Sequence, residues 1–309
     1  MKPLDFLIIG AQKCATTTLF EHLRSHPRIA MPLEKEVPFF TDADCSAERW
    51  QEFAVDQFGA EQEDKLWGKA SPQYMSDPNV AVRIQKLMPD IKLVAILRDP
   101  VQRSWSHFRM GQRRDTEHRE FSQAIASLLA ATGQTAGDAP VLPDHAQGYQ
   151  SEADFYVAWS EYGRILKEFT ACFDPGQLLV LYTEDLESDP AATVDRLLEF
   201  IGLPLGFRPS TLGEVMHRGG ASNRIPHSVR EWLRGRKLLY KLWQLLPDTQ
   251  RGRLRFQYEQ WNVAKNGDPM SLPDELHDQL CKHFGEDIRS LLSLPIEPPP
   301  WAGRYLGSS

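Results

Sequence analysis

The sequence has few cysteines and no long apolar run, and both shortages narrow the class of protein it can encode. Its four cysteines (Cys14, Cys45, Cys172 and Cys281) are scattered through 309 residues without a C-x-x-C pair. Neither a zinc site nor a disulfide framework is therefore indicated. No apolar stretch approaches the roughly 18 residues that a membrane-spanning helix needs. The first expected strand begins within a few residues of Met1, which leaves no room for a signal peptide. We expect a soluble, cytoplasmic protein.

The Walker A loop of magnesium-dependent NTPases is also missing. That loop has the form G-x-x-x-x-G-K-[ST], and no GK[ST] occurs in the chain. The N-terminal region instead combines the apolar run Phe6–Ile9, closed by Gly10, with a single Lys13 and a helix expected over Thr17–Ser25. Backbone N–H groups and the helix dipole both favour an anion at such a helix start. The arrangement predicts a phosphate-binding loop.

A second segment predicts another anion-binding position. The apolar strand expected over Leu93–Leu97 runs into a helix over Pro100–Gln112, with Asp99 as its N-cap. Arg98 then stands at the carboxyl end of a strand, where open α/β sheets bind ligands. Ser106 lies on the helix that follows, and a guanidinium with a hydroxyl suits a phosphate monoester. Taken alone, the segment is explained equally well by residues that simply cap a helix.

The two segments together resemble the sulfotransferases that use 3′-phosphoadenosine 5′-phosphosulfate (PAPS). Residues 10–19 are similar to the family's 5′-phosphosulfate loop, usually close to G-x-x-K-x-G-T-T-x-L. Residues 98–106 match its 3′-phosphate motif, R-D-P-x-x-R-x-x-S, at every specified position. Ala15 stands where the loop usually has glycine, and we expect a negative φ at this alanine because a positive φ strains any residue with a Cβ.

Two further segments resemble the Golgi heparan-type sulfotransferases and their bacterial relatives. Lys35–Phe40 is similar to their K-E-x-x-F-F segment, and Gly68–Tyr74 is similar to E-K-[ST]-P-x-Y. In the second segment Gly68 replaces the glutamate, and Ala70 is an extra residue before the serine.

The resemblance implies in-line transfer of a sulfuryl group from PAPS to a hydroxyl or amine, leaving adenosine 3′,5′-bisphosphate (PAP), without a metal. Lys13 would stabilise the leaving phosphate, and Glu36 would be the base that accepts the proton of the acceptor. Lys35 and Lys69 would contact the acceptor or the sulfonate. The residues expected to bind the donor are Lys13, Cys14, Ala15, Thr16, Thr17, Thr18, Arg98, Ser106 and Arg224.

Simpler roles stay open for several of these residues. Glu36 can lie on a solvated edge paired with Lys35, and Lys69 can be an ordinary surface lysine. Cys14 is expected to pack beside the loop. Cytosolic sulfotransferases use a histidine as base, but His107 lies inside the Pro100 helix, where we expect it to pack or cap. A kinase-like phosphotransferase and a non-catalytic PAPS- or PAP-binding protein are the alternative functions.

Alternating strands and helices indicate an α/β protein with a P-loop-like three-layer fold, in which helices flank a central parallel sheet. We expect a single sulfotransferase domain over residues 1–309, with a long surface loop over Thr132–Ser151. The expected strands are Phe6–Ile9, Glu36–Phe40, Leu66–Lys69, Leu93–Leu97 and Leu178–Tyr182. The expected helices are Thr17–Ser25, Val80–Leu87, Pro100–Gln112, Phe121–Ala131, Ala153–Cys172 and Pro190–Ile201.

One basic region stands out in a chain whose net charge is −7. Arg218–Arg255 holds ten Lys or Arg residues against two acids. Within it Ser228–Leu246 predicts a basic amphipathic helix, which can cover an acceptor cleft or contact a membrane surface. The acidic balance elsewhere argues against a nucleic-acid partner. The acceptor is expected to be a carbohydrate, a lipid or another small molecule.

Overall fold

The structure is a computed structural model, and it describes residues 2–32, 35–59, 62, 64–132, 152–213 and 272–307. Within these ranges five strands form one parallel sheet in the order β2–β3–β1–β4–β5. The strands are β1 (Phe6–Gly10), β2 (Ile29–Ala30), β3 (Leu66–Ala70), β4 (Lys92–Leu97) and β5 (Leu178–Tyr182). The expected α/β class with a central parallel sheet is confirmed.

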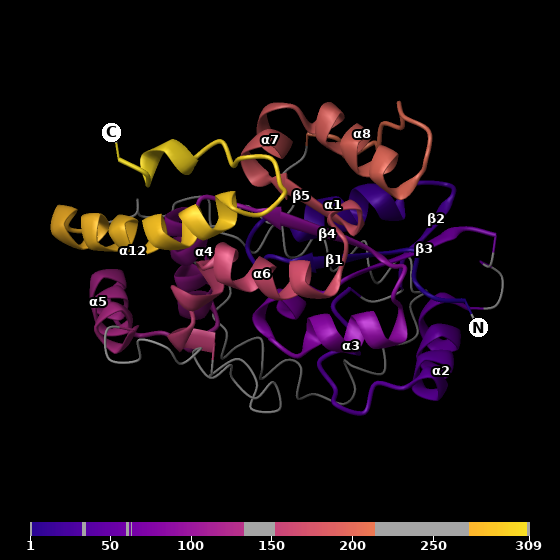
Figure 1. Cartoon of the computed structure of the whole chain (residues 1–309), viewed down its shortest axis with the longest axis horizontal. Coiled ribbons are helices and arrows are strands. Elements are labelled where there is room, and N and C mark those ends of the chain that lie inside the picture. The colour runs from indigo at the N-terminus through magenta and orange to yellow at the C-terminus, as the bar shows by residue number, and fades with distance from the viewer. Residues whose placement is uncertain are drawn as a thin grey trace, which may run out of the picture.

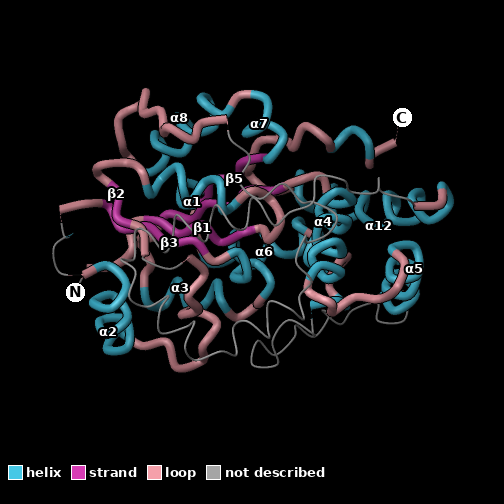
Figure 2. The backbone as a smooth tube through the Cα atoms, turned by 180° about the vertical axis from the view of Figure 1, so that it is seen from behind, coloured by secondary structure: helices cyan, strands magenta, loops and turns pink. Residues whose placement is uncertain are grey.

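Helices cover both faces of the sheet, so that three layers result (Figure 1). Both views place α1 (Thr16–Arg24), α7 (Thr183–Ser188) and α8 (Pro190–Ile201) on one face. The opposite face carries α3 (Val80–Leu87) and α6 (Tyr162–Cys172) (Figure 2).

The remaining helices lie toward the two ends of the sheet. The helix α2 (Ala47–Phe58) lies near the N-terminus, at the end opposite α4 (Pro100–Arg113), α5 (Phe121–Thr132) and α12 (Asp274–Leu292) (Figures 1 and 2). The helix α12 packs against α4, α5 and α6. The C-terminal part of the protein therefore completes the helical layer around α6.

The central strand β1 is buried along its whole length, as its unbroken apolar sequence requires for a strand covered on both faces. Its Phe6 pairs in register with Gly68 of β3. A Cβ built on Gly68 would lie 2.0 Å from Cζ of Phe6, so the phenyl ring occupies the space of any side chain at that position. This contact explains the glycine where the related segment carries glutamate.

Four of the five expected strands are confirmed, and Glu36–Phe40 is not a strand. The N–H of Glu36 donates to the carbonyl of Ala70 at 3.2 Å. Glu36 has a φ of +70°, however, and an extended strand cannot pass through a residue in this conformation. The N–H groups of Phe39 and Phe40 both donate to Oη of Tyr74 instead of to a neighbouring strand. The two-residue edge strand β2 takes the place at the sheet edge.

The helix expected over Ala153–Cys172 is also wrong in its first half, because only Tyr162–Cys172 is α-helical. Residues before it form short turns that end in a 3₁₀ helix, η4 (Ala158–Ser160). Backbone and side-chain oxygens in this stretch accept hydrogen bonds from α4, as described below. Three helices, α2, α7 and α12, were not expected from the sequence.

The strand-to-helix junction after β4 is confirmed, whereas the expectation for Ala15 is wrong. Oδ1 of Asp99 accepts hydrogen bonds from the N–H groups of Val101 and Gln102, both at 3.1 Å, and so caps α4. Ala15, at the start of α1, has a φ of +63°, the left-handed conformation that glycine accepts freely.

Three of the sequence expectations lie outside the described residues. They are Arg224, the basic region Arg218–Arg255 with its Ser228–Leu246 helix, and all of the Thr132–Ser151 loop except Thr132, which ends α5. Among the helices that the structure does describe, none is both long and apolar enough to cross a membrane.

Replacing Ala15 by glycine is expected to stabilise the protein. A left-handed conformation costs an L-residue roughly 1–2 kcal/mol, and the more flexible unfolded chain of glycine returns part of that gain. Ala15→Gly should raise the free energy of unfolding in urea by about 0.5–1 kcal/mol. Ala126→Gly, at an exposed position inside α5, is the matched control and should lower it by about 1 kcal/mol. Equal destabilisation by both variants would contradict the strain at Ala15.

Candidate active site

The carboxyl ends of β1, β2, β3 and β4 lie at one edge of the parallel sheet, and a candidate residue lies in the last turn of chain before this edge or after it: Lys69 within β3, and Lys13, Glu36 and Arg98 after β1, β2 and β4. Two hydrogen bonds hold these segments together: the N–H of Ala11 donates to the carbonyl of Ile96 at 2.8 Å, and the N–H of Ser71 donates to the carbonyl of Ile8 at 3.0 Å. The loop after β1 therefore lies between the exits of β3 and β4, because β1 lies between these strands.

The loop after β1 ends at a helix N-terminus, as the sequence predicts. It leads directly into α1, whose first-turn residues are Thr16, Thr17 and Thr18; the outer two are buried and the middle one is half-buried. The first N–H groups of a helix have no carbonyl partner within that helix. The first turn of α1 contains no acidic residue that would compete for them.

Lys13 is half-buried in this loop, and burial lowers the pKa of its ammonium to about 7. The charges of Arg113, Arg114 and Arg103 lower this pKa further, whereas the charge of Glu36 raises it. Lys13 thus lies within electrostatic range of Glu36, as the expected pairing of leaving-group cation and base requires. Sequence reasoning did not identify Arg113 and Arg114, which end α4 and had no motif to mark them.

Glu36 contacts two side chains at the site. It forms an ion pair with Lys35, and its Oε2 accepts a hydrogen bond from Nε2 of Gln73 at 3.3 Å. Burial alone would raise the pKa of Glu36, but Lys35, Gln73 and Arg114 together lower it below its ordinary value. Glu36 is therefore an ionised carboxylate at neutral pH and can accept a proton. The pairing with Lys35 is confirmed, although the pair is half-buried beside the loop.

Lys69 is not a surface lysine, because only 1% of it is exposed. Its Nζ donates to Oγ of Ser71 and lies 5.0 Å from the ring centre of Tyr74. Burial lowers the pKa of Lys69 to about 7, and the charge of Glu36 opposes this shift. The structure thus brings Lys69, Lys35 and Glu36 into one group.

Backbone conformation marks the same residues independently. Among the described residues, only four other than glycine have a positive φ: Lys13, Ala15, Glu36 and Asp115. The first three are residues that the sequence predicts for the site. Strained backbone of this kind concentrates at binding and catalytic positions.

The backbone around Arg98 is braced from two sides. Oγ1 of Thr183 donates to the carbonyl of Leu97 at 3.0 Å, and the N–H of Asp99 donates to Oε1 of Glu184 at 3.0 Å. Oη of Tyr162 lies 3.6 Å from Sγ of Cys14 and also hydrogen-bonds the backbone of Arg98.

The side chains of Arg98 and Ser106 are both half-buried, so each retains exposed surface. Arg98 follows β4 directly, and Ser106 lies in the second turn of α4.

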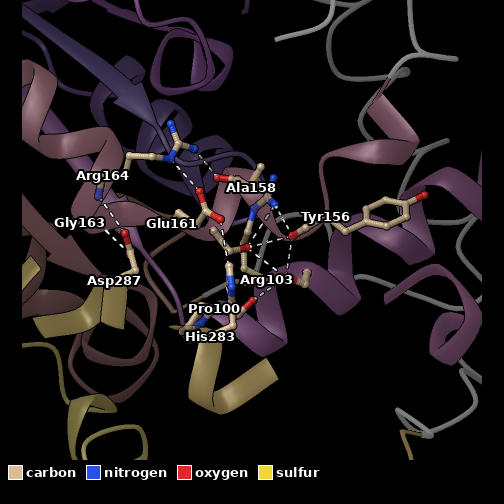
Figure 3. A network of polar contacts seen from close by, with 11 residues as sticks. Pro100, Arg103, Tyr156, Ala158, Glu161, Gly163, Arg164, His283 and Asp287 are labelled. Atoms are coloured by element: carbon tan, nitrogen blue, oxygen red, sulfur yellow. Dashed lines mark hydrogen bonds and ion pairs between the residues drawn. The ribbon is translucent and has the colours of Figure 1, made fainter. Parts of the chain in front are cut away.

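Arg103, the second arginine of the same motif, is fully buried and serves the architecture. Its Nε donates to the carbonyl of Gln12 at 3.1 Å, and its Nη1 donates to Oγ of Ser160 at 3.3 Å. The same Nη1 donates to the carbonyl of Tyr156 at 3.3 Å (Figure 3). The guanidinium therefore joins the loop after β1 to the turns before α6.

His107 and Cys14 pack, as expected. The imidazole of His107 is 1% exposed and stacks on the ring of Trp159, with centroids 5.1 Å apart. Burial and the charge of Arg103 hold its pKa well below the usual value, so the ring is neutral. Burial raises the pKa of the Cys14 thiol to about 11, which makes it a poor nucleophile.

A small cavity of about 80 Å³ lies beside the loop. It is lined by Ala15, Thr18, His22, Leu186, Glu187, Pro190 and Gly213. Within the described part of the chain, Oγ1 of Thr18 and Nδ1 of His22 are buried without a hydrogen-bond partner. Such groups are costly unless a ligand or water satisfies them.

Metal ligands are not gathered at this edge. Across the ranges that the structure describes, no group of three or more His, Cys, Asp or Glu side chains is arranged to hold a metal ion.

Comparison with known proteins identifies similarity to a membrane-associated sulfotransferase and to heparan sulfate sulfotransferases. The chain is 36% identical over 104 residues to the membrane-associated sulfotransferase kil1 of Dictyostelium discoideum, which covers 34% of this chain and 22% of that protein. It is 28% identical over 206 residues to the bifunctional heparan sulfate N-deacetylase/N-sulfotransferase 3 of Homo sapiens, covering 64% and 22%. It is 27% identical over 204 residues to the human heparan sulfate glucosamine 3-O-sulfotransferase 6, covering 64% and 52%. The matches thus span between about a fifth and a half of these relatives.

A solved structure supports the fold. The sulfotransferase of Alicyclobacillus acidocaldarius superimposes with a TM-score of 0.56 and 23% identity, over 83% of this chain and 97% of that one. The family model described as the sulfotransferase domain matches residues 3–219, which include the loop after β1, Glu36, Lys69 and the Arg98–Ser106 segment. Because this match spans more than half of the chain, the protein belongs to the sulfotransferase domain family.

Proposed function

We propose that this protein transfers the sulfuryl group of PAPS to a hydroxyl or amine of an acceptor and releases PAP. The observation that carries the proposal is that Lys13 and Glu36, two charges from separate segments, lie within electrostatic range of each other at the edge of the sheet where Arg98 also emerges. A cation for the leaving group and a carboxylate base are the two groups that this transfer requires.

The donor would be held at both ends. Lys13 and the first turn of α1, Thr16–Thr18, would bind the 5′-phosphosulfate, and Arg98 with Ser106 would bind the 3′-phosphate. The cavity beside Ala15 adjoins this loop, and among the described residues its lining atoms Oγ1 of Thr18 and Nδ1 of His22 lack hydrogen-bond partners, so a small polar group of the donor or a water would satisfy them. Cys14 and Ala15 contribute backbone to the loop, and Arg224 is proposed for the 3′-phosphate from the resemblance alone.

The reaction is a single displacement at sulfur. The acceptor oxygen or nitrogen forms a bond to sulfur while the bond between sulfur and the bridging oxygen of the 5′-phosphate breaks. The electron pair goes to the phosphate, where Lys13 neutralises the added charge. The proton of the acceptor goes to Glu36. Lys69 and Lys35, both within range of Glu36, would hold the acceptor or the transferred sulfonate.

The acceptor is proposed only as a class. The human relatives are named for heparan sulfate and its glucosamine, which makes a sugar hydroxyl or amine a reasonable first choice for this chain. A lipid or another small molecule is compatible with the same chemistry, because the reaction requires only a nucleophile beside Glu36.

The first test separates catalysis from donor binding. In an assay that follows PAP release from PAPS across a panel of sugar, lipid and small-molecule acceptors, Lys13→Ala should abolish turnover. Glu36→Gln should lower kcat by roughly 10²- to 10⁴-fold, the usual contribution of a general base, with PAP affinity unchanged. Unchanged turnover in the Lys13 variant would refute its role. PAP binding without turnover on any acceptor would favour a binding protein.

Arg98→Ala should weaken PAP binding by roughly 2–4 kcal/mol, the scale for removing one partner of a buried charged contact. Calorimetric titration with PAP and with adenosine 5′-monophosphate (AMP) measures this effect. The control ligand AMP lacks the 3′-phosphate and should bind the variant and the wild type alike. An equal loss for both nucleotides would place Arg98 elsewhere.

Donor binding should depend on pH through Lys13. With a pKa of about 7, the Lys13 amine of the nucleotide-free protein is mostly neutral at pH 8. A bound anionic nucleotide favours the charged form of this amine. PAP binding at pH 8 should therefore take up a proton, and affinity should fall by up to roughly tenfold per pH unit above 7 and level off below it. Calorimetry in buffers of different ionisation enthalpy measures the uptake. Lys69→Met should retain it and Lys13→Met should lose it; the reverse result would assign the proton to Lys69.

A further inference from the structure

The C-terminal segment reaches the donor site from outside the part of the chain that matches the family model. Oη of Tyr305 donates a hydrogen bond to Oδ1 of Asp99 at 2.8 Å, and Nη1 of Arg304 donates to Oδ2 at 3.3 Å. Asp99 is 4% exposed and follows Arg98 directly. The matched family region ends at residue 219, so this contact adds to the family's own motif.

Asp99 links three separate parts of the fold. Its Oδ1 caps α4 through the N–H groups of Val101 and Gln102, and its own N–H donates to Glu184 at the exit of β5. Tyr305 adds a further donor to Oδ1. The peptide that carries Arg98 is consequently fixed from the strand side, the helix side and the C-terminal side.

Tyr305 is itself held in place. It is 8% exposed, and its ring lies edge-on to the rings of Trp301 and Phe284. A Cβ at Gly285 of α12 would lie 2.8 Å from the carbonyl oxygen of Tyr305, so glycine there allows the two backbones to approach. Burial and the charge of Asp99 raise the pKa of Tyr305, which keeps the hydroxyl protonated as a donor.

We propose that Tyr305, assisted by Arg304, is a positioning residue for donor recognition. By holding Asp99 it sets the direction from which Arg98 meets the 3′-phosphate, so a segment 206 residues away in sequence determines the preference for a 3′-phosphorylated nucleotide. The proposal rests on the proposed function, because it assigns Arg98 to that phosphate.

The test compares two nucleotides that differ only in the 3′-phosphate. Wild-type protein should bind PAP more tightly than AMP in calorimetric titrations. Tyr305→Phe keeps the ring and removes one hydrogen bond, and it should lower the ratio of PAP to AMP affinity by roughly three- to tenfold. A general loss of structure would instead weaken the binding of both nucleotides equally and leave the ratio of PAP to AMP affinity unchanged.

Tyr182→Phe is the matched control. Its hydroxyl also donates to the C-terminal segment, at the carbonyl of Glu297, but does not touch Asp99. This variant should keep the wild-type ratio. An unchanged ratio in Tyr305→Phe, or an equal fall in Tyr182→Phe, would overturn the inference.

Two further outcomes are separable. If wild-type protein binds neither nucleotide, the proposed function fails first. If Tyr305→Phe does not fold, Arg304→Ala replaces it, because that side chain is 73% exposed and its loss cannot unfold the core. Its ratio should fall by roughly twofold, the scale of an exposed ion pair, and no fall would again overturn the inference.

Discussion

The site depends on the hydrogen bonds that the buried guanidinium of Arg103 donates. Arg103 is 0% exposed, and its Nε and Nη1 donate to oxygens of Gln12, Tyr156 and Ser160, whereas its Nη2 has no hydrogen-bond partner among the described residues. Burying a cation is costly, and these hydrogen bonds offset part of that cost. Because one of these oxygens belongs to the loop after β1, the stability of the cation and the shape of that loop depend on each other. The hydrogen bond from Arg103 to Gln12 helps to hold the loop in which Lys13 and Ala15 have positive φ angles.

Around this anchor, hydrogen bonds connect the segments that the sequence separates by long intervals. The loop after β1 is tied to β4 through Ala11, and Tyr162 links Cys14 to the backbone of Arg98. The proposed donor, held at both ends, would need a fixed distance between its two phosphate sites. These direct contacts would fix that distance before the donor binds, which would lower the entropy lost on binding.

Much of this arrangement was predictable from local sequence. The strands β1, β3, β4 and β5 are short apolar runs, and the cap at Asp99 with Pro100 marks the start of α4. The Glu36–Phe40 segment has the apolar pattern of a strand, but the N–H groups of Phe39 and Phe40 donate to the hydroxyl of Tyr74, a tertiary contact that no local pattern encodes. The helix α7 was missed because it is a short acidic helix of six residues at the exit of β5.

The candidate site shows the same division. Lys13, Glu36, Arg98 and Lys69 follow from motif spacing, but the burial of Lys69 depends on the rings of Phe53 and Tyr74, which come from other elements. Arg113, Arg114, Tyr162 and Tyr305 carry no motif, and only the folded chain brings them to the sheet edge. The expected negative φ at Ala15 was wrong, because the path of the loop into α1 imposes a positive φ that alanine alone does not favour.

The packing of α12 bears on where this protein can be divided. Asp287 of this helix accepts hydrogen bonds from the N–H groups of Gly163 and Arg164, both at 2.8 Å, and His283 pairs with Glu161 at 2.9 Å (Figure 3). Boundaries for recombinant expression taken from the family match would end the chain at residue 219. Such a fragment would leave the start of α6 without its capping carboxylate and uncover apolar side chains on its surface, and insolubility rather than a smaller active enzyme is the natural consequence.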